Sequence, residues 1–251
     1  MPQIVSQRDA RVVKKLPFCY VCGNTFVGSE EVTDDHVPPR AAFLPEDREN
    51  FPLVLRAHKG CNHAFHLEDE VFGQLLGIGH TVDQTHSRLR VSGGSVRAGN
   101  AFAVLENLDL HGVIRRWIAA FHAALYQEPI PPLTRFSTQT PLPSGRFLSG
   151  ELIPDPDMPQ FLDYTKQIEV NERLGLIDCI RANNGKLNYR CCWQRSDMGP
   201  WFALYRLDLY DWSKPGDTEN FRLRPCIGAY ASPGHIPSLA TRGTELWSVG
   251  S

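Results

Sequence analysis

The sequence predicts an α+β protein: an N-terminal ββα module that binds metal, a helical connector and a β-rich antiparallel C-terminal domain. Three observations lead to this prediction. The turn-rich stretch before residue 62 carries Cys19, Cys22 and Cys61 on either side of an Asp-His pair. Residues 103–126 repeat apolar side chains at helical spacing. Residues 186–194 and 201–212 alternate and carry many aromatic side chains, as paired strands do. The predicted limits are 1–76, 77–130 and 131–251.

The elements of the module follow from local patterns. A strand is expected from about Val32 and a second over 51–58, followed by a helix that starts at Asn62 and ends at Gly77 and Gly79. The Gly- and Ser-rich residues 77–100 are expected to form a loop.

The connector and the C-terminal domain are predicted in the same way. The helix over 103–126 has one apolar stripe, and Arg115, Arg116 and His122 lie off that stripe. The Pro-rich run 128–145 is the expected domain boundary. The aromatic residues of the last domain, such as Trp193 and Tyr205, are expected to pack in its core.

Composition excludes several classes of function. With 42% hydrophobic and 22% charged residues, the chain is typical of a globular protein, and its net charge of −2 argues against a uniformly basic nucleic-acid-binding surface. The N-terminus has no apolar signal region, and the most hydrophobic stretches are short and contain Arg or His. We therefore expect a cytoplasmic protein with no membrane partner. Seven cysteines in a reducing compartment favour metal ligands or free thiols over disulfides.

The spacing of four residues predicts a structural zinc site. Cys19-x-x-Cys22 supplies one chelating turn, and His58-x-x-Cys61 supplies the second. Three thiolates and one imidazole suit Zn²⁺, and four protein ligands close the site. His63 is an alternative to His58 as the fourth ligand.

An Asp34-Asp35-His36 triplet lies between the two chelating turns and directly before Val37-Pro38-Pro39. This order of motifs resembles the zinc-containing branch of the HNH endonucleases, which are also called ββα-metal or His-Me finger nucleases. The matching motifs are Cys-x-x-Cys, Asp-His followed by prolines, a strand, and Cys61-Asn62 at the start of a helix. The resemblance covers about residues 17–76.

The resemblance implies a catalytic role for each matching position. His36 would be the general base that activates water, and Asp35 and Asn62 would bind a catalytic Mg²⁺ or Mn²⁺. His66, four residues after Asn62, would be a third ligand or a phosphate contact, and its nitrogen would let the site accept Ni²⁺ or Co²⁺. The implied reaction is hydrolysis of phosphodiester bonds in DNA.

The sequence departs from the family pattern at two points. Asn50 is the only candidate for the asparagine that orients the base, and it lies farther from Asn62 than usual. The family often has a lysine or arginine three residues after the asparagine, and Phe65 occupies that position here. Arg40 or Arg56 would therefore have to stabilise the negative charge of the transition state.

Nucleic acid could also be contacted outside the module. Residues 84–105 contain no acidic residue but include Arg88, Arg90 and Arg97, which together with Arg40 are candidate phosphate contacts. A solvated loop is the alternative interpretation. DNA is the expected partner and RNA is not excluded; the C-terminal domain could also bind a second copy or another protein. The two other functions considered are a catalytically inactive zinc-dependent nucleic-acid-binding module and a structural zinc protein.

Overall fold

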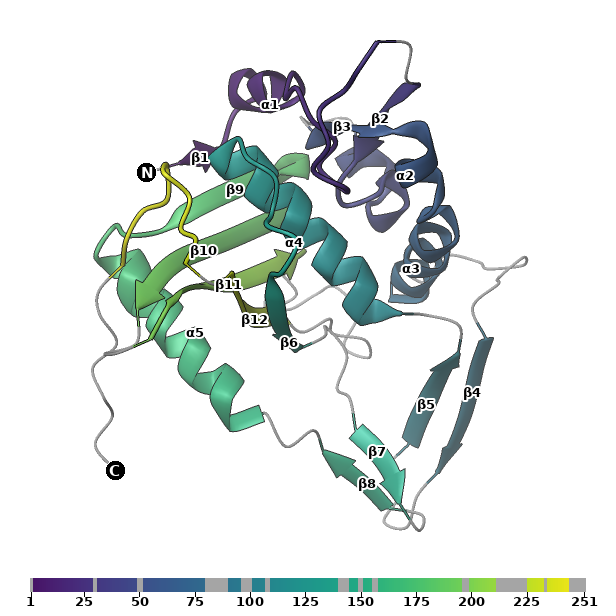
Figure 1. Ribbon diagram of the computed structural model, residues 1–251. Helices are drawn as coiled ribbons and strands as arrows, with labels where there is room; N and C mark the ends of the chain where they lie inside the picture. Colours follow the sequence, from purple (N-terminus) through teal and green to yellow (C-terminus); the bar gives the residue numbers. More distant parts are fainter. Residues whose placement is uncertain are drawn as a thin grey trace.

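The computed structural model describes most of the chain, and its largest sheet has six strands (Figure 1). Strands from both the N-terminal and the C-terminal half of the chain belong to this sheet. The described residues are 2–28, 31–48, 52–79, 90–95, 101–106, 109–139, 145–148, 151–154, 158–195, 199–210, 225–232 and 234–243. The α+β prediction is confirmed, with a Cys₃His cluster near the N-terminus and a largely antiparallel six-stranded sheet in the C-terminal half.

The sheet has the strand order β1-β9-β10-β11-β12-β6. Its strands are β1 (Gln3–Ile4), β6 (Arg135–Gln139), β9 (Asp178–Ala182), β10 (Leu187–Arg195), β11 (Trp201–Leu209) and β12 (Cys226–Ala231). All neighbours pair antiparallel except β1, which lies parallel to β9 at one edge. The predicted pairing of β10 with β11 is therefore confirmed, and the N-terminal segment joins the C-terminal sheet.

One helix covers each face of this sheet (Figure 1). Helix α4 (Leu110–Tyr126) packs on the face that carries Cys191 and Trp193, whereas α5 (Met158–Arg173) packs on the face that carries Cys192 and Leu204. Trp193 and Tyr205 are buried, as predicted. Helix α5 was not predicted, because the second half of the sequence indicated mostly strands.

The N-terminal module contains the predicted two strands and helical segment. Strand β2 (Val32–His36) pairs antiparallel with β3 (Val54–His58), and helices α2 (Lys59–His63) and α3 (His66–Gly79) follow. The module also contains α1 (Gln7–Val13) and two 3₁₀ turns, Arg40–Ala42 and Pro45–Asp47; a third turn, Asn183–Gly185, follows β9. Module and sheet share one hydrophobic cluster, in which the Phe72 ring of α3 meets Trp117 of α4 edge-on at 4.7 Å.

The predicted single helix from Asn62 is wrong, because a break at Ala64 and Phe65 separates α2 from α3. The Phe65 N–H donates to the Asn62 carbonyl three residues back, which tightens the last turn of α2. The direction of α3 is then set by its own packing on α4. Asn62 and His66 consequently belong to two different helices.

Two further predictions along the connector are corrected. The expected loop over 77–100 contains the end of α3 and strand β4 (Arg90–Ser95), and the expected helix from 103 begins at Leu110 after strand β5 (Ala101–Glu106). Backbone pairing of β4 with β5 does not need large side chains, which is why the Gly- and Ser-rich composition was misleading. A short hairpin of β7 (Gly145–Leu148) and β8 (Glu151–Pro154) follows the connector.

The polar positions of α4 are also corrected. Arg116 and His122, expected outside the apolar stripe, are 5% and 0% exposed. Each has a polar partner inside the protein, Asp69 for Arg116 and Tyr230 for His122. Burial of both is possible because neighbouring elements cover α4 on more than one side.

Candidate functional site

The first chelating turn is a tight loop closed by a bridge between Phe18 and Thr25. The Cys19 N–H donates to the Asn24 carbonyl (2.9 Å), and the Gly23 N–H donates back to the Cys19 carbonyl (2.8 Å). Gly23 has a φ of 77°, a left-handed conformation that favours glycine. The loop thus directs Cys19 and Cys22 to the same side.

The second chelating turn brings His58 and Cys61 to these thiols. The ligand atoms of Cys19, Cys22, His58 and Cys61 all lie within 4.8 Å of one another. His58 Nδ1 is 3.4 Å from Cys22 Sγ and 4.0 Å from Cys61 Sγ. Tetrahedral zinc with Zn–S bonds of about 2.3 Å requires ligand separations of about 3.6–3.8 Å, so the four residues fit a structural zinc ion.

The Cys₃His cluster contains His58 and not His63. His63 lies outside the cluster, and its ring faces His66 with the ring centroids 6.2 Å apart. The His58 N–H also points at Cys19 Sγ (3.4 Å), and the edge of Phe26 packs against the His58 ring at 5.1 Å. These contacts orient the ligands from outside the first coordination shell.

Asp35 and His36 are neighbours on β2, so their side chains project from opposite faces of the strand. Asp35 is buried and accepts a hydrogen bond from the Tyr20 hydroxyl. Burial raises the pKa of Asp35, and the Tyr20 hydrogen bond and Arg116 counteract part of that rise. His36 is half-buried, and burial followed by the nearby Arg40 lowers its pKa, which favours a neutral imidazole.

Asn62 lies over the face of β2 that carries Asp35. The Asn62 Nδ2 donates to Thr33 Oγ1 at 3.1 Å, and Thr33, two residues before Asp35, points to the same side of the strand. Asn62 and His66 also line one hollow of about 420 Å³, together with Asp69. The break between the two helices therefore leaves both predicted side chains at a common cleft.

Asp69 and Arg116 form an ion pair at this cleft that the sequence did not indicate. The Arg116 guanidinium also lies over the Phe65 ring, 4.8 Å from its centroid. Burial, which outweighs the attraction of Arg116, raises the pKa of Asp69 to about 6. Helical spacing alone could not identify this pair, because the two residues are far apart in the sequence and lie on different helices.

The remaining predicted residues are only partly described. Arg40 is exposed at the start of the first 3₁₀ turn, and Arg90 is the first residue of β4. Asn50, Arg88 and Arg97 lie outside the described residues.

The predicted catalytic ligands do not form a compact metal cluster of the kind seen at Cys19. Among the described residues, two groups of at least three His, Cys, Asp or Glu side chains have ligand atoms within 4.8 Å, and Asp35 and His66 belong to neither. One group is the Cys₃His cluster, and the other lies at the C-terminal end of α4.

Comparisons with protein-family models, with curated proteins and with solved structures give no match. Within the described part of the chain, no helix combines the length and apolar character needed to cross a bilayer.

Proposed function

We propose that the chain is a metal-dependent endonuclease of the HNH type that hydrolyses phosphodiester bonds in DNA. The observation that carries the proposal is the hydrogen bond between Asn62 Nδ2 and Thr33 Oγ1 (3.1 Å), because it brings the helix that follows β3 to the strand face of Asp35. The ββα order and the hollow that Asn62 shares with His66 support it further. The Cys₃His cluster supports it as the structural centre that holds β3 and α2 against the first turn.

His36 is the proposed general base. A neutral imidazole accepts a proton from water, and burial of the ring favours that neutral form. The ring lies at the end of β2, on the opposite face from Asp35, so water activation and cation binding are assigned to different sides of the strand.

Asp35, Asn62 and His66 are the proposed ligands of the catalytic cation. When bound, Mg²⁺ or Mn²⁺ would neutralise negative charge on the phosphate and on the leaving oxygen. Two oxygen donors and one imidazole would also accept Ni²⁺ or Co²⁺. Arg40 is exposed and lies four residues after His36 in the sequence. It is the proposed phosphate contact, because Phe65 stands where related nucleases often have a basic residue.

A plasmid-nicking assay tests the proposal. The purified chain, with its zinc content measured, is incubated with supercoiled plasmid in Mg²⁺ or Mn²⁺ and in EDTA. His36→Ala should lower the nicking rate by about 10²–10⁴-fold, the range for loss of a positioned general base. The matched control His111→Ala replaces an exposed histidine at the start of α4 and should nick at the wild-type rate.

Full activity of His36→Ala would refute the assigned base. No metal-dependent cleavage of plasmid by the zinc-loaded wild-type chain would refute the proposed function, and cleavage of RNA alone would refute DNA as its substrate.

A catalytically inactive, zinc-dependent nucleic-acid-binding module is the second candidate. The observation that favours it is the engagement of both carboxylates at the cleft, Asp35 by the Tyr20 hydroxyl and Asp69 by Arg116. This alternative predicts plasmid binding without any nicking in Mg²⁺, Mn²⁺, Ni²⁺ or Co²⁺.

A further inference from the structure

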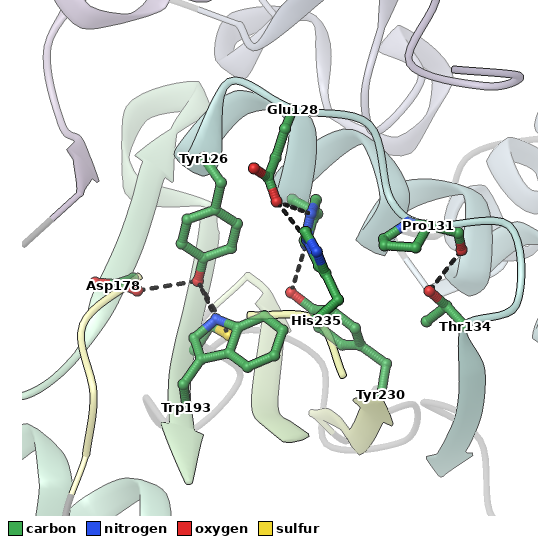
Figure 2. Close-up of polar contacts among 10 residues, drawn as sticks. Tyr126, Glu128, Pro131, Thr134, Asp178, Trp193, Tyr230 and His235 are labelled. Carbon is green, nitrogen blue, oxygen red and sulfur yellow. Dashed lines mark hydrogen bonds and ion pairs between the residues drawn. The ribbon is translucent and has the colours of Figure 1, made fainter. Parts of the chain in front are cut away.

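A second group of metal-ligating side chains lies outside the N-terminal module. His122 belongs to the last turns of α4, Glu128 follows the left-handed cap residue Gln127, and His235 comes from the segment after β12. The ligand atoms of the two histidines and the glutamate all lie within 4.8 Å of one another. Figure 2 shows Glu128 and His235 pointing toward each other next to Tyr230.

The distances in this group are close to those around a bound metal ion. Glu128 Oε1 is 2.6 Å from His235 Nε2 and 3.7 Å from His122 Nε2. A tetrahedral ion with bonds of about 2.0–2.1 Å separates its ligand atoms by about 3.3 Å. The two observed distances lie on either side of this value, so small side-chain movements would complete the geometry.

One ring nitrogen of His122 is buried and faces the Glu128 carboxylate beyond hydrogen-bonding distance. The His122 side chain is completely buried, and among the described residues Nε2 makes no hydrogen bond. The other ring nitrogen, Nδ1, lies 3.1 Å from the Tyr230 hydroxyl. When Nδ1 carries the proton and donates to Tyr230, Nε2 presents a lone pair toward the Glu128 carboxylate. In this tautomer a metal cation between the nitrogen and the carboxylate would satisfy both electron-pair donors, as a proton on Nε2 does in the other tautomer.

The position of His122 is fixed before any ligand binds. The Tyr126 hydroxyl, one helical turn later, donates to Asp178 Oδ2 (3.0 Å) and accepts from Trp193 Nε1 (3.0 Å) (Figure 2). The Tyr126 and Tyr230 rings pack against the His122 ring, with centroids 4.9 and 5.7 Å away. A histidine held in this way loses little conformational freedom on binding a metal ion.

We propose that His122 Nε2, Glu128 Oε1 and His235 Nε2 form a second binding site, for a divalent transition-metal ion such as Zn²⁺, Ni²⁺ or Co²⁺. Two imidazoles and one carboxylate favour these ions over Mg²⁺ and Ca²⁺, which prefer all-oxygen sites. Glu128 and His235 are only partly buried, so water can complete the coordination. Tyr230 is the outer partner that orients the His122 ring through Nδ1.

The proposed site would connect two parts of the fold. It ties the end of α4 to the segment after β12. Pro129, the neighbour of Glu128, lies against the first chelating turn, where a side-chain carbon built on Gly23 would lie 3.2 Å from Pro129 Cβ. The inference does not depend on the proposed nuclease activity, because none of its three ligands belongs to the module.

Cobalt binding to the full chain distinguishes the two sites. Thiolate ligands of Cys19, Cys22 and Cys61 give Co²⁺ an intense sulfur-to-metal charge-transfer absorption, whereas a His₂Glu site gives only weak ligand-field bands. His66→Ala removes the imidazole of the proposed catalytic cation site, and the chain with this change should bind about two equivalents of Co²⁺, one with each signature. Cys22→Ser should weaken or remove the charge-transfer band and keep the second set of bands.

Variants of the two partly buried ligands test the assignment without changing the fully buried His122. In the His66→Ala chain, His235→Gln and Glu128→Gln should each lose the weak bands and bind about one equivalent of Co²⁺, retaining the charge-transfer band. His111→Gln, an exposed histidine of the same helix, should match the wild type. Tyr230→Phe keeps the ring but not the hydroxyl and should bind the second ion about 10–100-fold more weakly.

The site is refuted if the His66→Ala chain binds only the thiolate-coordinated ion, or if adding His235→Gln or Glu128→Gln to that chain leaves the amount of bound Co²⁺ unchanged. Either result would leave Glu128 and His235 as a hydrogen-bonded pair without a metal ion. Circular dichroism of each variant confirms that the fold is retained.

Discussion

Replacement of Arg116 by methionine should destabilise the protein by about 3 kcal/mol, because it leaves Asp69 ionised and largely buried without its partner. The side chains of Arg116 and Asp69 are 3% and 16% exposed. Breaking a buried ion pair from one side costs about 3–5 kcal/mol. Asp69 lines the hollow next to Asn62, where water can reach it, so we expect the lower end of that range. Methionine keeps most of the apolar volume over Phe65, which limits any contribution from a cavity.

The double variant Arg116→Met/Asp69→Leu separates the charge effect from packing. Replacing both partners of a buried pair with apolar residues is often neutral or stabilising, so the double variant should recover most of the lost stability. The matched control is Lys14→Met, which removes the surface ion pair with Asp34 (2.5 Å; side chains 47% and 48% exposed). An exposed pair contributes about 0–1 kcal/mol, and we expect a change in that range.

Urea unfolding of zinc-loaded protein, followed by tryptophan fluorescence, measures these free energies. At about pH 8 the carboxyl of Asp69 is ionised in the wild-type protein, where burial raises its pKa, Arg116 lowers it, and the pKa is about 6. At about pH 5 it binds a proton in the folded state, so the cost of Arg116→Met should become smaller. A loss below about 1 kcal/mol at pH 8, or a double variant no more stable than Arg116→Met, would refute the argument.

Two further predictions concern the first chelating turn and DNA binding. Gly23→Ala should destabilise the protein by about 1–2 kcal/mol, because the φ of Gly23 is 77° and Pro129 leaves little room for a side chain. The control Gly60→Ala, where a new Cβ would have nothing within 4 Å, should be neutral or stabilising. Equal urea midpoints for the two variants would contradict this. Neutralising Arg88, Arg90 and Arg97 together should weaken DNA binding and reduce the slope of log K against log salt by up to about 0.9 per lost contact, measured by fluorescence anisotropy. An unchanged slope would assign these arginines to solvent.

Local patterns in the sequence were sufficient for the Cys₃His cluster and for much of the secondary structure. Two residues between paired ligands force a chelating turn whatever the rest of the fold does, so Cys19, Cys22 and Cys61 could be assigned directly. Strands β10 and β11 were predicted because alternation and a short turn are properties of neighbouring residues. The choice of His58 over His63, by contrast, depended on how β3 ends against the first turn.

The tertiary structure alone decided which polar side chains are buried and which distant residues meet. Arg116 and His122 were expected outside the apolar stripe of α4, but α3 and the sheet cover those positions and supply Asp69 and Tyr230 as partners. His122 and His235 come together only because β12 returns the chain to the end of α4. The sequence by itself determined the ligands that lie within one turn of each other; contacts between residues distant in the chain depend on how the helices and the sheet pack, which local spacing does not specify.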